Sequence, residues 1–305
     1  MIAIDKNFIW ILMAVFAYLI NSVVFIIDKY FLTSTIPKPI VYTFYIGVLS
    51  LASLIFIPFG FTMVDSGIII ASAIYGLLYL LGLIFLFKGY KRIDISDAAP
   101  FAGAFLPIFV FLFSLFLIEE TFSLIKLLAF VLLVAGGFII SFRKKHHTKL
   151  EKRHYYYLIL SSILLGASFV IIKMIFDSIG FVNGYIWTRL GLFSFSILLL
   201  LLPSVREKIF DNFKSTKTST RGLVIFNKVL VGIGFFILFF AISKSSVVLV
   251  NSLQGIQFAF LLMLVAIFSH KFKSLNDEKL FRQGIWNKII AIILISIGLA
   301  LLSIQ

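Results

Sequence analysis

The chain has 305 residues, of which 61% are hydrophobic and only 13% are charged, and its mean hydropathy is +1.12. This composition is too apolar for a soluble globular domain, so we expect an integral membrane protein. The net charge of +14 does not indicate nucleic-acid binding, because the basic residues concentrate in loops between apolar stretches. The lack of cysteine excludes disulfide bonds and thiol chemistry.

Ten apolar stretches follow one another, and each is long enough to cross about 30 Å of hydrocarbon as a helix. The first stretch lacks the cleavage site of a signal peptide, so we expect it to be retained. The expected spans are 8–27, 40–59, 66–87, 97–118, 122–142, 155–176, 183–202, 222–243, 246–269 and 285–303. The sequence therefore predicts an all-α integral membrane protein with ten transmembrane helices.

The distribution of basic residues predicts the orientation of these spans. Most Lys and Arg residues lie in or beside loops that follow odd-numbered spans, whereas only Lys6 and Lys244 lie close to the opposite loops. By the positive-inside rule the basic loops are cytoplasmic, which places both termini outside the cytoplasm. We expect a multi-pass protein of the plasma (inner) membrane whose basic loops also attract anionic membrane lipids.

The charged segment RKKHHTKLEKRH at 143–154 separates two groups of five spans that match in sequence. In the fifth and tenth spans, Lys126, Ala129, Gly136 and Ser141 correspond without a gap to Lys288, Ala291, Gly298 and Ser303. In the first and sixth spans, Asn21 is opposite Gly166 and Asp28 is opposite Lys173. Because five is odd, the second copy enters the membrane from the other side. We predict a first repeat at 1–142, a basic linker at 143–154 and a second, inverted repeat at 155–305.

Four features carry a resemblance to a known family: GASFVIIK at 166–173, Arg189 early in the seventh span, Pro107 in the fourth, and EETFSLIKLLAFVLLVAGG at 119–137. With these features the chain resembles the drug/metabolite transporter superfamily, specifically its EamA-type members with ten helices. The ninth span departs from that pattern, since Phe260 stands where the fourth span has Pro107. The resemblance implies export or exchange of small metabolites.

Polar and helix-weakening residues inside a bilayer are costly, and they usually face a cavity or a partner. The ninth span carries an amide stripe, with one amide every three residues: Asn251, Gln254 and Gln257. The fourth span carries a slim face with two missing backbone donors, formed by Pro100, Ala104 and Pro107. We expect the two stripes to line opposite walls of a central cavity. The alternative is that the amides form hydrogen bonds between helices.

Further polar residues are candidates for the same cavity. Arg189 lies about 9 Å deep in the seventh span and cannot lose its proton, so it needs a carboxylate, a carbonyl or an anionic substrate. The alternative is that Arg189 pairs with another residue for structural reasons or extends to the membrane interface. Asn227 and Lys228 lie comparably deep in the eighth span, where we expect the lysine to extend to the cytoplasmic interface. Asn21 and Ser22 add a polar patch at mid-depth or bond neighbouring helices.

Other chemistries lack support in the sequence. The carboxylates nearest the spans lie at their ends, so no residue stands out for proton coupling: Asp28, Asp97, Glu119 and Glu120. The histidines of the basic linker lack acidic neighbours suited to a metal, so we expect no metal site: His146, His147 and His154. Phosphate-binding loops and nucleophile motifs do not occur, so we expect neither a cofactor nor enzymatic activity.

These features predict a secondary transporter that moves a small polar, zwitterionic or anionic metabolite by alternating access, through export, exchange or facilitated diffusion. Two alternatives stay open: a carrier of lipids or lipid-linked molecules, and a membrane scaffold, which needs no continuous polar cavity. We expect the partners to be a small-molecule substrate and membrane lipids, but no nucleic acid, and the protein to be a monomer or a homodimer. The candidate cavity residues are Asn21, Ser22, Pro100, Ala104, Pro107, Arg189, Asn227, Asn251, Gln254 and Gln257.

The orientation is testable by cysteine labelling in intact cells. Because the chain has no native cysteine, single cysteines at Lys149, Lys217 and Ser66 give a clean background. An impermeant thiol reagent is expected to label the cysteine at Ser66 and to spare the other two. Labelling at Lys149 and Lys217 with protection of Ser66 would reverse the orientation.

Overall fold

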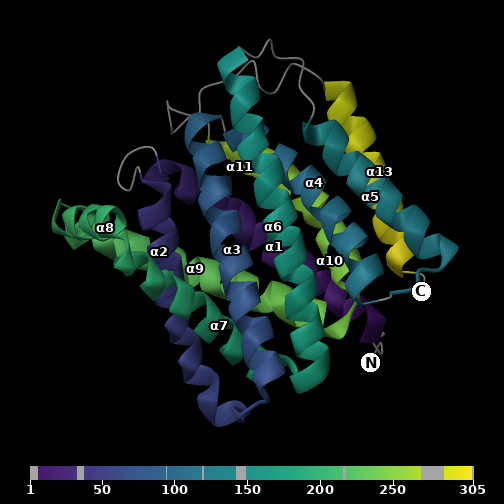
Figure 1. Ribbon diagram of the computed structural model, residues 1–305. Helices are drawn as coiled ribbons and strands as arrows, with labels where there is room; N and C mark the ends of the chain where they lie inside the picture. Colours follow the sequence, from purple (N-terminus) through teal and green to yellow (C-terminus); the bar gives the residue numbers. More distant parts are fainter. Residues whose placement is uncertain are drawn as a thin grey trace.

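The computed structural model describes residues 6–32, 38–93, 95–118, 120–141, 149–215, 218–268 and 285–303. Throughout these residues the regular structure is helical, and the helices pack side by side in one bundle (Figure 1). Seven of the described helices are long and apolar enough to cross a membrane, namely Ile9–Asp28, Pro39–Phe59, Ser66–Arg92, Ala98–Leu117, His154–Ile179, Phe181–Leu201 and Gly222–Lys244. The chain is an all-α, multi-pass integral membrane protein.

The helices follow the expected spans closely, with three differences. Helices α1 (Lys6–Tyr30), α3 (Ser66–Arg92), α4 (Ile95–Leu117), α5 (Leu124–Ser141), α7 (Phe181–Leu198), α9 (Thr218–Lys244) and α13 (Ile285–Ser303) each correspond to one span. The second span is α2 (Pro39–Leu49) continued by the 3-10 helix η2 (Ser50–Phe59), and the ninth is divided into α10 (Val247–Ser252) and α11 (Gln254–Phe268). Helix α6 (Lys149–Ile179) begins inside the predicted linker. Three apolar helices are shorter than the other seven: Leu124–Ile139, Val247–Leu261 and Ile289–Ser303.

Part of the predicted linker lies outside the described residues, including His146 and His147, and so does Lys217. From Lys149 onward the linker sequence is helical, because it continues directly into the apolar run of α6 without a glycine or proline to end the helix.

The outer surface of the bundle is apolar. Large hydrophobic side chains on several spans are about half exposed, among them Phe16, Ile70, Leu128, Phe226 and Ile292. Such a continuous apolar exterior would be unfavourable in water and matches the hydrocarbon of a bilayer.

A short amphipathic helix, α8 (Pro203–Ser215), lies in the segment that the sequence suggested was only a basic loop. It follows the short 3-10 helix η3 (Leu199–Leu201) and lies at the edge of the bundle, to the left in Figure 1. Val205 and Ile209, one turn apart, are buried, and the Tyr45 hydroxyl of α2 donates a hydrogen bond to Asn212 Oδ1 at 3.3 Å. These contacts hold the α7–α9 connection against the bundle.

Glycines let the backbones of α3 and α7 approach closely. A Cβ added to Gly76 would lie 2.4 Å from the backbone carbon of Gly191, and one added to Gly191 would lie 2.0 Å from the Ser72 carbonyl oxygen. Close approach through small residues is a main source of helix association in lipid, where the hydrophobic effect no longer drives it. This interface therefore fixes α7 against α3.

The contact between α5 and α13 has a reciprocal pattern. A Cβ on Gly136 would meet Ile295 at 2.7 Å and the Ala291 carbonyl oxygen at 3.0 Å. A Cβ on Gly298 would meet Leu133 at 2.7 Å and the Ala129 carbonyl oxygen at 3.2 Å. As residue numbers rise along α5 they fall along α13, so the two helices, side by side in Figure 1, run antiparallel.

The α3–α7 interface predicts a position-specific effect of one methyl group. Gly76→Ala is expected to lower the free energy of unfolding by about 1–3 kcal/mol, because the rigid backbone of Gly191 has to move. Gly232→Ala is the matched control, since a Cβ there meets nothing within 4 Å. Melting curves of the purified variants give the comparison, and equal melting temperatures would contradict this close approach.

Candidate functional site

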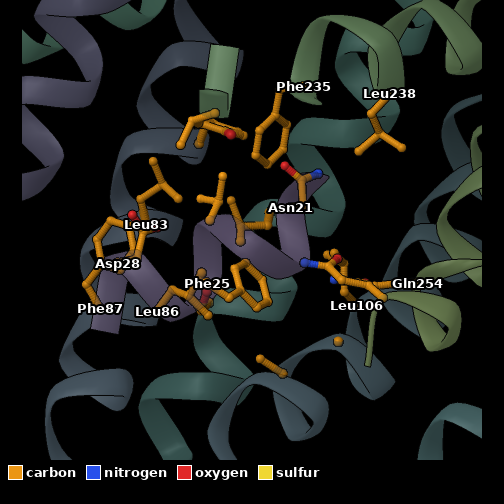
Figure 2. A pocket seen from close by; sticks show the side chains of 18 of the residues that line it. Asn21, Phe25, Asp28, Leu83, Leu86, Phe87, Leu106, Phe235, Leu238 and Gln254 are labelled. Atoms are coloured by element: carbon orange, nitrogen blue, oxygen red, sulfur yellow. The ribbon is translucent and has the colours of Figure 1, made fainter. Parts of the chain in front are cut away.

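A cavity lies inside the bundle between α1, α3, α4, α6, α9 and the α10–α11 pair (Figure 2). It contains about 890 Å³ of empty space, including the part that opens to the outside. Its lining falls within Tyr18–Asp28 of α1, Tyr79–Tyr90 of α3 and Ala102–Leu106 of α4. In each of these helices, the lining segment belongs to the half that is nearer to a basic loop. The cavity therefore occupies the half of the bundle on the side of the basic loops.

The amide stripe of the ninth span lines this cavity. Asn251, Gln254 and Gln257 are all lining residues, and Asn21 of α1 joins them. A Cβ at Gly234 would lie 2.6 Å from Asn21 Oδ1, so this glycine of α9 leaves room for the amide. In Figure 2, Asn21 and Gln254 lie to the right of Asp28 and Phe87, which occupy the left of the view.

Three of these amides carry a buried polar atom without a hydrogen-bond partner among the described residues: Asn21 Oδ1, Gln254 Oε1 and Gln257 Nε2. The fourth, Asn251, donates from Nδ2 to the Val247 carbonyl at 2.8 Å. An unpaired buried polar group costs about 1–3 kcal/mol. Three such atoms therefore belong to residues of one cavity wall and have no partner among the described residues.

The helix is interrupted where the amides lie. Helix α10 ends at Ser252 and α11 begins at Gln254, with Leu253 in a turn between them. The Val250 carbonyl, on the last turn of α10, accepts from the Leu253 amide at 3.3 Å and from the Tyr18 hydroxyl at 2.9 Å. Tyr18 thus satisfies a carbonyl at the break and also lines the cavity.

The face of α4 that meets the cavity is rotated from the predicted one. Ala102, Gly103 and Leu106 line the cavity, whereas Pro100, Ala104 and Pro107 are not among the lining residues. A Cβ on Gly103 would lie 2.1 Å from the Phe258 ring and 3.0 Å from Gln254 Cδ. The slimness of α4 at this point therefore lets the amide stripe of α11 approach it. One residue along a helix is a turn of about 100°, which accounts for the difference.

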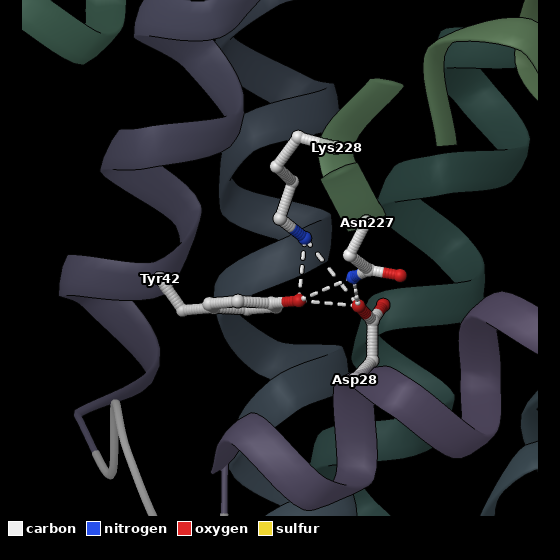
Figure 3. Close-up of polar contacts among 4 residues, drawn as sticks. All are labelled: Asp28, Tyr42, Asn227 and Lys228. Carbon is white, nitrogen blue, oxygen red and sulfur yellow. Dashed lines mark hydrogen bonds and ion pairs between the residues drawn. The ribbon is translucent and has the colours of Figure 1, made fainter. Parts of the chain in front are cut away.

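A buried ion pair at the cavity wall was not predicted (Figure 3). Asp28 Oδ1 accepts from Asn227 Nδ2 at 2.8 Å, from Lys228 Nζ at 3.4 Å and from the Tyr42 hydroxyl at short range. Lys228 Nζ also donates to the Tyr42 hydroxyl and lies 3.8 Å from the centre of the Tyr42 ring. Asp28 and Lys228 are only 5% and 7% exposed, so Lys228 does not extend to the interface as expected.

Within this cluster, Asp28 and Lys228 line the cavity, whereas Tyr42 and Asn227, which both donate to Asp28, are not lining residues. The sequence suggested that Asp28 was an unremarkable residue at a helix end. The signal that was missed is that α1 ends, and α9 begins, at the same predicted side of the membrane. Asp28 and Lys228 are therefore brought to a similar depth on two antiparallel neighbours.

Arg189 lies outside the cavity lining, in a sheath of aromatic rings. Its guanidinium carbon is 5.0–5.8 Å from the centres of four rings, those of Tyr75, Tyr79, Tyr185 and Phe239, and it donates to the Tyr75 hydroxyl. Among the described residues its Nε has no hydrogen-bond partner, and it forms no ion pair. Cation–π attraction to the ring faces compensates part of the cost of burying this charge.

Ser22 and Glu120 are two further polar residues that the sequence singled out, whereas Glu119 lies outside the described residues. The Ser22 hydroxyl donates to the Leu19 carbonyl at 2.6 Å and does not line the cavity. Glu120 lies between α4 and α5, where burial raises the pKa of its carboxyl, although hydrogen bonding to Ser246 and the charges of Lys173 and Lys126 counteract this effect. Both of these groups lie away from the cavity wall.

The fold and the cavity define a class of protein: a multi-pass membrane protein with a partly polar chamber inside its bundle. No protein-family model and no curated protein matches the chain. Among 28 matching chains of solved structures, one described only as "Crystal structure of protein" is 15% identical with a TM-score of 0.65. The match covers 97% of this chain and 96% of that chain. At this identity the likeness shows that the two chains share a fold over nearly their whole length.

The ion pair predicts a strongly non-additive mutant cycle. Asp28→Asn leaves the Lys228 ammonium buried without its counter-charge, so it is expected to lower the free energy of unfolding by about 3–5 kcal/mol. Adding Lys228→Gln removes that charge and is expected to restore most of the loss. Denaturation of the two single variants and the double variant measures the coupling. Losses that simply add would show that the two charges do not depend on each other.

Proposed function

We propose that this protein is a secondary transporter that moves a small metabolite with polar and apolar parts by alternating access. The observation that carries the proposal is the cavity, in which unpaired amides and a buried ion pair lie within the membrane-spanning bundle. Polar groups at this depth are costly and are most often retained for a substrate or ion path. The chain's resemblance to the EamA-type drug/metabolite transporters is consistent with this function, and we propose membership of that superfamily.

We also propose that the three shorter apolar helices complete a set of ten spans in two inverted repeats. The reciprocal contacts of Gly136 and Gly298 support this arrangement, because Gly136 corresponds to Gly298, and Ala129 and Leu133 correspond to Ala291 and Ile295. Exchange of equivalent contacts is the property of a two-fold axis. Because the two helices are antiparallel, such an axis would cross them and lie in the membrane plane.

A second exchange supports the same symmetry. Inverted repeats would interchange α2 with α7 and α3 with α9. Tyr42 of α2 accepts a hydrogen bond from Lys228 of α9, and Tyr75 of α3 accepts one from Arg189 of α7. The symmetry would therefore carry the α2–α9 pair onto the α7–α3 pair. A tyrosine–cation contact joins the helices of each pair, but the tyrosine lies on α2 in the first pair and on α3, the equivalent of α9, in the second.

The two halves of the bundle differ in a way that favours access from one side. Next to the cavity, on the side away from the basic loops, aromatic rings fill the space between α6, α7 and α9. The Phe181 ring lies 5.3 Å from Phe176 and 5.2 Å from Phe236, and Phe236 is 5.2 Å from Tyr185. In alternating access this aromatic cluster would be the closed gate while the cavity faces the cytoplasm.

The two alternatives make different demands on the cavity. A carrier of lipids or lipid-linked molecules is favoured by the apolar side chains that form most of the lining, such as Val24, Leu83, Leu86 and Leu165. A scaffold has no use for unpaired polar atoms that weaken the fold. A small-molecule transporter uses both kinds of lining, and we therefore place it first.

Transport is tested in proteoliposomes loaded with labelled amino acids, nucleosides or organic acids, and with a fluorescent phospholipid for the lipid alternative. Leu106→Trp fills the cavity and is expected to reduce the flux of at least one soluble compound about tenfold or more. Leu112→Trp on the same helix is the control, because Leu112 is 42% exposed on the outer surface. The proposal fails if no soluble compound moves faster than in protein-free vesicles, or if Leu106→Trp transports like the control.

A further inference from the structure

The connection between α7 and α9 carries a helix, α8, whose sides differ in chemistry. The Leu202 carbonyl accepts from the backbone amides of Val205 and Arg206 at 3.0 and 2.9 Å, so the first turn of α8 begins at Leu202. Pro203 occupies the first helical position, where its missing N–H leaves no bond unmade. Val205 and Ile209 are buried against the bundle. The remaining sides of α8 therefore decide what surrounds it.

One exposed row of α8 combines two apolar side chains with one base. Leu202, Arg206 and Phe210 follow one another at intervals of four residues, which places them along one side of the helix. Leu202 and Phe210 are 52% and 53% exposed, and Arg206 between them is exposed as well. Leu198 and Leu201 are also exposed. Exposed apolar residues thus continue along the chain from the end of α7 into α8.

The other exposed residues of α8 are charged and lie on a different side. Glu207 and Asp211 are also four residues apart, and their row lies about 100° round the helix from the row of Arg206 and Phe210. Lys208 is exposed and lies about 200° from Arg206, almost on the opposite side. Helix α8 thus presents one side to the bundle, one mixed apolar and basic side, and one side with charges of both signs.

This division suits a helix that lies on a membrane surface. Helix α8 lies at the edge of the bundle, to the left in Figure 1, and joins α7 to α9 on the side of the basic loops. The positive-inside rule predicts that this side carries the anionic cytoplasmic leaflet. An interfacial helix buries its apolar side about 5–10 Å deep, at the boundary of headgroups and acyl chains. A guanidinium on that side lies at the level of the lipid phosphates, which it can bind through two N–H donors.

We infer that α8 is a docking site for an anionic phospholipid. Leu202 and Phe210 contact the acyl chains, Arg206 binds the phosphate, and the acids Glu207 and Asp211 face the water. A row of three side chains is too small for a stable protein interface, which buries roughly 1,200–2,000 Å². It is large enough for a lipid headgroup and the first part of its chains. This contact would exist whether or not the protein transports a metabolite.

The placement of α8 is testable by electron paramagnetic resonance on the full chain in vesicles of phosphatidylcholine and phosphatidylglycerol. Because the chain has no native cysteine, Phe210→Cys and Asp211→Cys each accept a single nitroxide label. The label at 210 is expected to be relaxed more by oxygen, which concentrates in lipid, than by a water-soluble nickel chelate, and the label at 211 to show the reverse. A label at 210 that responds mainly to nickel would overturn the docking site. A label there that responds to neither reagent would also overturn it, because another protein would then cover this side.

The headgroup contact is testable with two matched variants. Arg206→Gln and Lys208→Gln each remove one exposed positive charge from α8, but only Arg206 lies in the row with the apolar side chains. Phosphatidylglycerol added to the detergent-solubilised protein is expected to raise the melting temperature, since the Tyr45–Asn212 hydrogen bond ties α8 to α2.

Arg206→Gln is expected to weaken this lipid binding about fivefold, which corresponds to the roughly 1 kcal/mol that one basic residue gains near an anionic surface. Lys208→Gln is expected to bind like the wild type. Equal weakening by both variants would indicate a diffuse attraction and overturn the site, as would unchanged binding by Arg206→Gln. An equal stabilisation by inorganic phosphate would show a site for free anions instead of a lipid.

Discussion

The cost of burying charge in a medium without water is the constraint on which this structure depends. Asp28 and Lys228 pair with each other and share Tyr42, and Asn227 donates to Asp28, whereas Arg189 relies on four aromatic faces and one hydroxyl. These are two different solutions to one electrostatic problem. The first solution holds its charges at the cavity wall. In the second solution the charge of Arg189 lies outside the cavity lining. Tyr79, one of the four rings around Arg189, does line the cavity.

Close packing places these charges. In lipid, helices gain little from burying apolar surface, so precise contact between small residues becomes the main attraction. Gly76 and Gly191 bring α7 against α3, which sets Arg189 beside Tyr75. Gly234 makes room for Asn21 between α1 and α9, the same two helices that carry Asp28 and Lys228. The glycine contacts between helices therefore help to set the positions of the buried polar groups.

The sequence predicts most of the fold and only part of the site. Hydropathy identifies the apolar helices, because a membrane span needs a long uninterrupted run, and i, i+3 spacing identifies the amide stripe, which does line the cavity. The inverted repeat stays a prediction, since the contacts support it without fixing the membrane crossings of the shorter helices. Helix α8 was missed because the apolar positions that it buries, Val205 and Ile209, are too few to stand out in a charged loop. The Asp28–Lys228 pair was missed because pairing depends on which helices are neighbours, and a single sequence does not contain that information.

A transporter has to change shape without leaving its buried charges unpaired at any stage. The break between α10 and α11 provides a place for bending, because Leu253 interrupts the regular hydrogen bonding and Tyr18 already satisfies the Val250 carbonyl. Tyr42 and Asn227 serve the same purpose for Asp28, since each donates a hydrogen bond to its carboxylate in addition to Lys228. Because Lys228 and Asn227 both lie on α9 and Tyr42 lies on α2, a shift of α9 under the proposed function would still leave the Asp28 carboxylate with one hydrogen-bond donor.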